Sequence, residues 1–268
     1  MYESELRAMI EAGKEASAEV LRIYQKGFSV KIKEDNSPVT DADIASDALL
    51  RKKLSVFSDI AWLSEEEADD SSRLQKRALF IVDPLDGTAD FVHHDGTFGI
   101  NLALVVDHAP VASFIALPAR QAFAYALKGA GTYFVSPDGK EERLHVSSRT
   151  DHLIALMSRT HVLPEEEEVL EVNKDKVAQA IASGASTKAV MLAAGKGDFS
   201  IRFTDQTKEW DTCAPELVVE EAGGVFLDSK LKPFTYNRKD VYNHDGYSMF
   251  NCQENTILLK NYYAGSAN

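Results

Sequence analysis

Apolar residues recur every three or four positions over residues 3–26, which predicts an amphipathic helix at the start of the chain. A short β-like run follows at residues 29–33. A second helix is predicted from Thr40 to about residue 54, because the Thr40 hydroxyl can accept a free backbone N–H of a first helical turn. The chain is therefore expected to open with two helices joined through a short extended segment.

The middle of the chain alternates short apolar runs with turn residues. The runs at residues 60–63 and 78–82 each stop close to an acidic residue, Glu65 and Asp83 respectively. From Phe98 onward the runs are closely spaced and are separated by glycine-rich turns, a spacing that predicts an antiparallel meander. Its strands are expected at residues 100–105, 111–117 and 122–127.

The pattern changes after about residue 152, where short apolar runs begin to alternate with helical segments. Such alternation is typical of α/β structure. We therefore expect an N-terminal α+β half, residues 1–152, packed on a C-terminal α/β half, residues 153–268. The second half is expected to hold strands at residues 153–157 and 224–227 and helices at residues 186–194, 210–222 and 255–263.

The chain carries a formal net charge of −13, which argues against a nucleic-acid polymer as partner. A small anionic substrate remains compatible with this charge, because a bound divalent cation reverses the local sign of a pocket lined by carboxylates. The two cysteines, Cys213 and Cys252, do not form a disulfide framework. No apolar run is long enough to span a bilayer, and the early acids of the first helix do not fit a secretory signal. A cytoplasmic location is therefore expected.

The most informative stretch is the run from Asp83 to Thr88, Asp-Pro-Leu-Asp-Gly-Thr, which follows an apolar strand. Pro84 removes a backbone donor and is expected to stop the strand, while Gly87 permits a tight turn. Asp83 and Asp86 can then converge on one point, and Mg²⁺ prefers such oxygen ligands. The same residues also form an ordinary Asp- and Gly-containing turn, so this stretch alone leaves both interpretations open.

Two further acids point to the same chemistry. Glu65 ends another short strand, and Asp211 lies where a helix is expected to begin. Asp211 also fits a plain helix N-cap, a role that leaves its oxygens free to bind a metal.

With these acidic segments, the chain resembles the lithium-sensitive, Mg²⁺-dependent phosphatase superfamily that includes inositol monophosphatase and fructose-1,6-bisphosphatase. The resemblance extends from about residue 5 to residue 260. It implies a layered αβαβα sandwich, with an antiparallel-sheet half packed on an α/β half. Four segments carry it: Val39-Thr40-Asp41-Ala42-Asp43, Ser64-Glu65-Glu66, Asp83-Pro84-Leu85-Asp86-Gly87-Thr88 and Glu209-Trp210-Asp211-Thr212.

The resemblance also implies roles for individual residues. Thr88 and Asp43 are expected to orient and deprotonate the attacking water, with Glu66 helping to position it; Asp43 also fits a capping box with Thr40. The backbone N–H groups of Gly87 and Thr88 are expected to bind phosphate oxygens if they open a helix. The implied metal ligands are Glu65, Asp83, the backbone carbonyl of Leu85, Asp86 and Asp211.

The implied activity is hydrolysis of a phosphate monoester by water that two or three Mg²⁺ ions activate, without a phosphoenzyme. Lithium inhibition follows from the same resemblance. The partner is then a small-molecule phosphate ester, and the sequence leaves the oligomeric state open between monomer and homodimer.

Three segments of the second half are Ser158-Arg159-Thr160-His161, Gly184-Ala185-Ser186-Thr187-Lys188 and Trp210-Asp211-Thr212-Cys213-Ala214-Pro215-Glu216. Within the superfamily they resemble segments of 3′(2′),5′-bisphosphate nucleotidases, which convert adenosine 3′,5′-bisphosphate to AMP and phosphate. This resemblance implies that Lys188 binds the phosphate that is not cleaved, although Lys188 also fits a surface lysine on a helix. His161 likewise fits a loop histidine without a ligand. The implied substrate-binding residues are Gly87, Thr88, Ser158, His161, Gly184, Lys188 and Asp211.

Two alternatives to this assignment remain open. Ala89-Asp90 after the acidic box is closer to inositol monophosphatases than to the Lys-Glu common in the nucleotidases. An inositol monophosphatase or another sugar phosphatase on the same scaffold is therefore the first alternative. The second is an acidic, metal-binding regulatory protein without activity, against which Thr88 argues because metal storage needs no water-activating hydroxyl.

Overall fold

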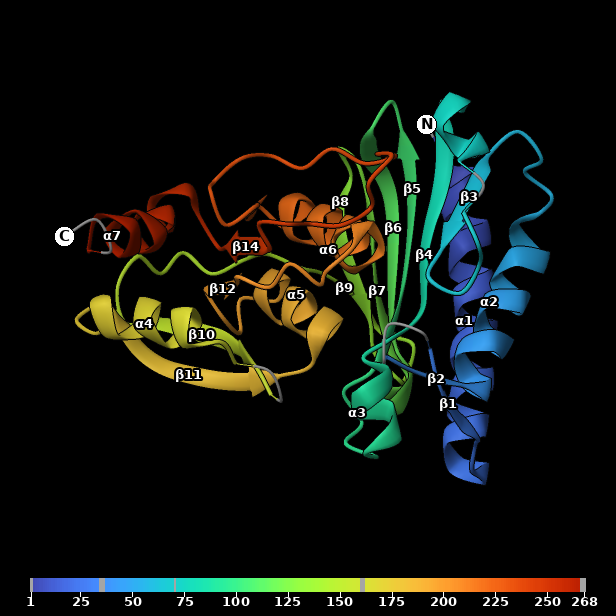
Figure 1. The fold of residues 1–268 in the computed structure, drawn as a ribbon, viewed down its shortest axis with the longest axis horizontal. Helices are drawn as coiled ribbons and strands as arrows, with labels where there is room; N and C mark the ends of the chain where they lie inside the picture. Colours follow the sequence, from blue (N-terminus) through green and yellow to red (C-terminus); the bar gives the residue numbers. More distant parts are fainter. Residues whose placement is uncertain (1, 34–36, 70, 160–161, 266–268) are drawn as a thin grey trace.

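The computed structural model describes residues 2–33, 37–69, 71–159 and 162–265, and its elements stack in five layers (Figure 1). Helices α1 (Glu3–Lys26) and α2 (Asp41–Leu54) cover the outer face of a seven-stranded sheet. Helices α5 (Ala185–Ala193) and α6 (Glu209–Glu221) lie between this sheet and a five-stranded one. The expected αβαβα sandwich is confirmed by this order of layers, which α4 and α7 complete on the far side.

Helix α1 buries the face that the sequence predicts, including Leu6, Met9 and Val20. Gly13 on this face is required by packing, since a Cβ atom there would lie 2.2 Å from the Phe114 ring. Its cost in helix propensity is therefore offset by the close approach of α1 to the sheet.

Helix α2 begins where the sequence places it, with Thr40 as N-cap. The Thr40 hydroxyl accepts a hydrogen bond from the N–H of Ala42 at 3.1 Å. The Asp43 carboxylate accepts in return from the N–H of Thr40 at 2.8 Å, so the predicted capping box is present.

The seven-stranded sheet runs in the order β3-β4-β5-β6-β7-β8-β9. Strands β3 and β4 are parallel, and every later neighbour pair is antiparallel, which confirms the predicted meander. The strands are β3 (Ala61–Ser64), β4 (Ala78–Asp86), β5 (Gly99–Val106), β6 (Ala109–Leu117), β7 (Ala122–Leu127), β8 (Gly131–Val135) and β9 (Glu141–Arg143).

Strand β4 continues past Pro84, contrary to the expectation that this proline would stop it. Asp83 pairs with Asn101 and Asp86 pairs with Gly99, with a register shift between the two pairs. The missing N–H of Pro84 falls within this irregularity, so no ladder hydrogen bond is lost. The irregularity keeps both aspartates at the same end of the sheet.

The five-stranded sheet has the order β11-β10-β12-β14-β13. Strand β10 is parallel to β11 and β12, while β14 is antiparallel to β12 and β13. Its elements are β10 (Leu153–Ser158), β11 (Val177–Ser183), β12 (Phe199–Arg202), β13 (Val225–Leu227) and β14 (Tyr247–Phe250), with α4 (Pro164–Val172) and α7 (Ile257–Gly265) on the outer face. The shorter elements are β1 (Val30–Ile32), β2 (Pro38–Thr40), α3 (Thr88–Val92) and the 3₁₀ turns η1 (Ser72–Gln75), η2 (Pro118–Arg120) and η3 (Gln253–Thr256).

Helix α6 contributes to both central cores. Val218 packs with residues of the first sheet and Val219 packs with residues of the second. The helix also buries a polar pair, because the Tyr236 hydroxyl donates to Glu216 Oε2 at 2.5 Å. Burial raises the pKa of Glu216 to about 8, so its carboxyl group is mostly protonated at neutral pH.

Glu216 is therefore expected to make stability depend on pH. Its pKa is higher in the folded chain, so its contribution is full below the unfolded pKa and is lost as pH rises through about 8. Between pH 5 and 8 the free energy of unfolding should fall by on the order of 1 kcal/mol per pH unit from this group. Denaturant titrations at several pH values measure the free energy of unfolding of wild type and of Glu216→Gln. Equal slopes of this free energy against pH in the two proteins would contradict the assignment.

Candidate metal centre

Three carboxylates from two elements meet at one end of the first sheet. Asp83 and Asp86 lie at the end of β4, and Asp211 lies in the first turn of α6. One oxygen from each carboxylate lies within 4.8 Å of the others. Asp83 and Asp86 are buried and Asp211 is partly exposed, so the group opens on one side.

Each carboxylate is held by a backbone N–H group from a different segment. Asp83 Oδ1 accepts from the N–H of Leu85 at 3.0 Å. Asp86 Oδ2 accepts from the N–H of Ser186 at 2.7 Å and also from the Ser186 hydroxyl, 100 residues away in sequence. Ser186 was not predicted in this role, because no local pattern links it to Asp86.

Asp211 is the third residue of α6, and the N-cap is Lys208, so the alternative in which Asp211 itself caps the helix is wrong. Its Oδ2 atom accepts from the N–H of Lys208 at 2.6 Å. The carboxylate thus still bonds a free donor of the first turn, and its other oxygen stays available.

The three carboxylates repel one another strongly. Burial and the charges of Glu65, Asp86 and Asp211 raise the pKa of Asp83 well above its usual range. Desolvation of the carboxylate and the charges of Glu65 and Asp86 do the same for Asp211. Burial raises the pKa of Asp86, which the Ser186 hydrogen bonds and the Lys188 charge oppose. An all-oxygen set of crowded anions fits a hard divalent cation such as Mg²⁺, whose charge would remove the repulsion.

Glu65 and Glu66 follow β3 beside this group. The Lys33 ammonium lies 2.6 Å from Glu66 Oε1 and 3.4 Å from Glu65 Oε1. Glu65 is outside the group of three that share the 4.8 Å limit, but its charge is among the causes that raise the pKa of all three aspartates. Burial raises the pKa of Glu66 to about 7, against the pull of Lys33. Lys33 was not predicted, because it follows a three-residue strand with no signal of its own.

The side chains of Thr88, in α3, and Asp43, in α2, are in contact. The Thr88 hydroxyl lies 3.0 Å from Asp43 Oδ1 and 3.1 Å from the carbonyl oxygen of Leu85. Asp43 Oδ2 accepts from the Thr40 N–H and hydroxyl instead. The Asp43 carboxylate therefore fits both the capping interpretation and the interpretation as a partner of Thr88. Its Oδ2 atom belongs to the capping box, and its Oδ1 atom contacts Thr88. Burial raises the pKa of Asp43.

A helix does open after the acidic box, which is the condition for Gly87 and Thr88 to act as phosphate donors. Gly87 is the N-cap of α3 with φ of 80°, a left-handed conformation that favours glycine, and Thr88 is the first helical residue. This turn places the Thr88 hydroxyl next to the carbonyl of Leu85.

A cavity of about 190 Å³ opens beside the carboxylates. Most of the residues predicted to bind substrate line this cavity. His161, which was also predicted to bind substrate, lies outside the described residues. The predicted residues that line the cavity are Asp86, Gly87, Ser158, Gly184, Lys188 and Asp211.

Lys188 is 2% exposed, so the interpretation as a surface lysine is wrong. Among the described residues its ammonium has no hydrogen bond or ion pair. Burial and the charge of Arg202 lower its pKa to about 8. Arg202, which lines the same cavity, lies 2.8 Å from Glu166 of α4. Arg202 was not predicted to line the site, because strand β12 has no clear signal in the sequence.

The family model for the inositol monophosphatase family matches residues 1–255 of the chain. The chain belongs to this family. It is 32% identical over 249 residues to the 3′(2′),5′-bisphosphate nucleotidase CysQ of Aggregatibacter actinomycetemcomitans, covering 91% of each protein. It is 28% identical to CysQ of Escherichia coli strain K12, over 90% of this chain and 98% of the relative.

Solved structures of the family match the fold closely. CysQ from Bacteroides thetaiotaomicron superposes with a TM-score of 0.81 at 32% identity, over 93% of this chain and 97% of that one. The extragenic suppressor protein suhB from Bartonella henselae gives a TM-score of 0.81 at 25% identity, over 98% and 99%. Membership and the acidic cluster together make this chain a metal-dependent phosphomonoesterase of a Mg²⁺-dependent family. No helix within the described ranges has the length and apolar character needed to cross a membrane.

The crowded carboxylates lead to a prediction about stability. Asp83→Asn removes one of the repelling charges, so the metal-free variant should melt at a higher temperature than metal-free wild type. Wild type should gain stability on addition of Mg²⁺, and the variant should lose most of that gain along with several orders of magnitude in turnover. Thermal melts with Mg²⁺ and with chelator measure both effects. If Mg²⁺ raises the melting temperature of Asp83→Asn as much as that of wild type, Asp83 is not a metal ligand.

Proposed function

We propose that the protein is a 3′(2′),5′-bisphosphate nucleotidase that converts adenosine 3′,5′-bisphosphate to AMP and phosphate. The observation that carries this proposal is the pair of cations, Lys188 and Arg202, in the cavity that opens beside the three aspartates. Arg202 already pairs with Glu166, so Lys188 is the cation on which the proposal depends. A monophosphate of a neutral polyol would leave the buried Lys188 ammonium without an anion once its phosphate lies at the metals, whereas a second phosphate on the substrate would provide one.

The buried state of Lys188 supports this assignment. A lysine that is 2% exposed and without a partner among the described residues is costly in the absence of a ligand. A substrate phosphate would compensate that cost through a charge-assisted hydrogen bond. The relatives named as bisphosphate nucleotidases, at 28–32% identity, point to the same substrate class.

The proposed metal ligands are the side chains and carbonyl that the resemblance implied: Glu65, Asp83, Leu85, Asp86 and Asp211. Two or three bound Mg²⁺ ions would supply charge neutralisation for the phosphate and the leaving oxygen, and would lower the pKa of the attacking water. Lithium inhibition, which the family resemblance also implies, stays a prediction.

Thr88 and Asp43 are proposed to take the proton of the attacking water. Asp43 Oδ1 can accept the hydroxyl proton of Thr88, which leaves a lone pair of Thr88 Oγ1 for the water proton. The raised pKa of Asp43 makes it a better base than an exposed aspartate. Glu66 is proposed to help position the same water, and the N–H groups of Gly87 and Thr88 to bind phosphate oxygens.

We also propose that the two halves of the chain supply different residues of the site. Residues 1–152 would supply most of the metal ligands and the proton acceptor. Residues 153–268 would supply Asp211 and the specificity residues Ser158, His161, Gly184 and Lys188.

The roles of Asp43 can be separated by mutation. Thr88→Ala should lower turnover by roughly a hundredfold, the scale of general-base assistance, with little change in melting temperature. Thr40→Ala removes the hydroxyl's hydrogen bonds to Asp43 Oδ2 and from the Ala42 N–H. It leaves the contact of Asp43 Oδ1 with Thr88, so it should lower the melting temperature more than the turnover. Steady-state kinetics and thermal melts of both variants measure this. If Thr88→Ala keeps wild-type turnover, the hydroxyl does not activate water.

The substrate assignment predicts a selective effect of Lys188. Lys188→Ala should lower kcat/KM for adenosine 3′,5′-bisphosphate by roughly ten- to a hundredfold, because it removes a charge-assisted hydrogen bond to the second phosphate. Its effect on inositol 1-phosphate should be much smaller. Lys196→Ala, an exposed lysine just after the same helix, is the matched control and should leave both substrates unaffected. Equal losses on the two substrates would reject the nucleotidase assignment.

An inositol monophosphatase is the second candidate, and one observation favours it. Asp90 lines the same cavity, and a carboxylate there can accept hydrogen bonds from the hydroxyls of a polyol. A wild-type enzyme with a higher kcat/KM for inositol 1-phosphate than for the bisphosphate would support this candidate.

A further inference from the structure

The long connection between β13 and β14 crosses the N-terminal turn of α6. We call its residues 236–243 the bracing segment. The N–H of Glu209 donates to the carbonyl of Val241 at 2.9 Å, and the N–H of Asn243 donates to the carbonyl of Thr207 at 2.7 Å. The Asn243 side chain donates to the carbonyl of Lys208 at 2.8 Å. The first turn of α6 is thus bonded to the bracing segment on both sides of Lys208.

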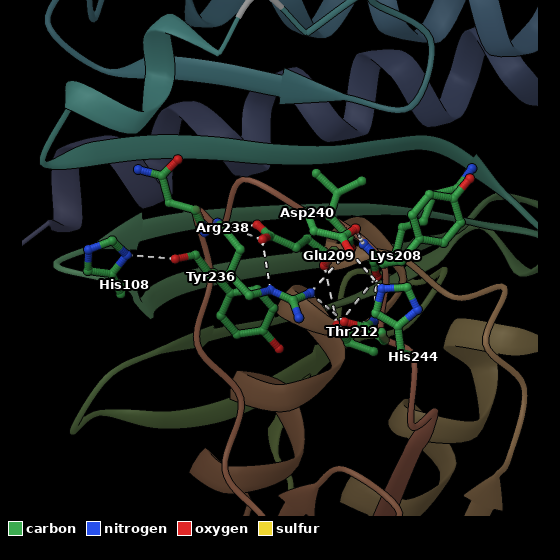
Figure 2. Close-up of polar contacts among 12 residues, drawn as sticks. His108, Lys208, Glu209, Thr212, Tyr236, Arg238, Asp240 and His244 are labelled. Atoms are coloured by element: carbon green, nitrogen blue, oxygen red, sulfur yellow. Dashed lines mark hydrogen bonds and ion pairs between the residues drawn. The ribbon is translucent and has the colours of Figure 1, made fainter.

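Glu209 lies at the centre of this contact (Figure 2). Its side chain is fully buried, and its Oε1 atom accepts from the N–H of Arg238 at 2.8 Å and from Arg238 Nε at 3.1 Å. Its Oε2 atom accepts from the N–H of Asn237 at 2.8 Å. Both carboxylate oxygens are therefore used to bind one segment.

The bracing segment is also fixed from outside α6. The buried guanidinium of Arg73 donates to Asn237 Oδ1 at 2.9 Å and to the carbonyl of Arg238 at 2.9 Å. His108 Nδ1 lies 2.7 Å from the carbonyl of Tyr236, as Figure 2 shows. The segment is therefore a rigid support, which is a condition for positioning another residue.

Lys208 connects this support to the metal centre. Its N–H group donates to Asp211 Oδ2 at 2.6 Å, and its carbonyl accepts from the N–H of Asp211 at 3.1 Å and from Asn243. A shift of Lys208 would therefore move the carboxylate of Asp211.

We propose that Glu209, paired with Arg238, is a positioning residue that sets the carboxylate of Asp211 for metal binding. The pair fixes the bracing segment, the bracing segment fixes Lys208, and Lys208 orients Asp211. This inference rests on the proposed role of Asp211 as a ligand. Residues that orient a metal ligand typically change metal affinity by about 10–100-fold when they are mutated.

The test is metal binding by the free protein, measured by calorimetric titration with Mg²⁺ in the absence of substrate. Glu209→Gln keeps the size of the side chain but replaces one acceptor oxygen with an NH₂ group that faces a backbone donor. Its Mg²⁺ affinity should fall about tenfold. Arg238→Lys is the second variant, should Glu209→Gln not fold, and is expected to lower affinity because it loses the bonds of Arg238 to Val241 and Asn243.

Tyr236→Phe is the matched control. It removes a buried hydrogen bond between the bracing segment and α6, but that bond ends on Glu216, beyond the first turn. It should lower the melting temperature and leave Mg²⁺ affinity unchanged. An equal loss of affinity in Tyr236→Phe would show a general effect of stability and overturn the proposal, as would wild-type affinity in Glu209→Gln.

Asp211→Asn is the reference variant and separates this proposal from the proposed function. Wild-type Mg²⁺ affinity in Asp211→Asn would remove Asp211 from the ligands and the positioning role with it. Loss of affinity in Asp211→Asn and Glu209→Gln, together with no cleavage of adenosine 3′,5′-bisphosphate by wild type, would reject only the substrate assignment.

Discussion

Mutual repulsion among Asp83, Asp86 and Asp211 is the constraint around which the rest of the structure is arranged. Like charges within 4.8 Å in a largely buried place are unfavourable unless each is held and all are neutralised. The fold holds them with backbone N–H donors from Leu85, Ser186 and Lys208. In the function that we propose, Mg²⁺ would supply the neutralising charge. Phosphoester hydrolysis would use the same concentration of charge, because metals that relieve the carboxylates would also bind the phosphate.

The layered architecture explains how such distant residues meet. Helix α6 packs on both sheets, so its first turn lies at the end of β4, where Asp83 and Asp86 are located. Helix α5 begins beside Asp86, which places Ser186 on that carboxylate and Lys188 in the adjoining cavity. Lys188 and Asp211 are thus held by two neighbouring helices of one layer, while β4 carries Asp83 and Asp86 and β12 carries Arg202.

The local signals in the sequence were reliable where the local chain decides the structure. The helix at residues 3–26 and the Thr40 cap depend on periodicity and on hydrogen bonds over a few residues. The strand through Pro84 was predicted to stop too early, because its continuation depends on pairing of Asp86 with Gly99 in the next strand. Lys33 and Arg202 were missed, because neither lies in a segment with a local signal of its own and their partners Glu66 and Glu166 are distant in sequence.

The sequence by itself determined the family through its four segments. It also pointed to Glu65, Asp83, Asp86 and Asp211 as candidate metal ligands, because these acids lie at the ends of apolar runs or at a helix start. Only the tertiary structure decided that Asp43 both caps a helix and contacts Thr88, that Lys188 is buried, and that Glu209 braces the turn that carries Asp211. The physical reason is the separation along the chain over which each interaction acts. Caps and periodicity act over a few residues, whereas burial and the distances between charges depend on how whole layers pack together.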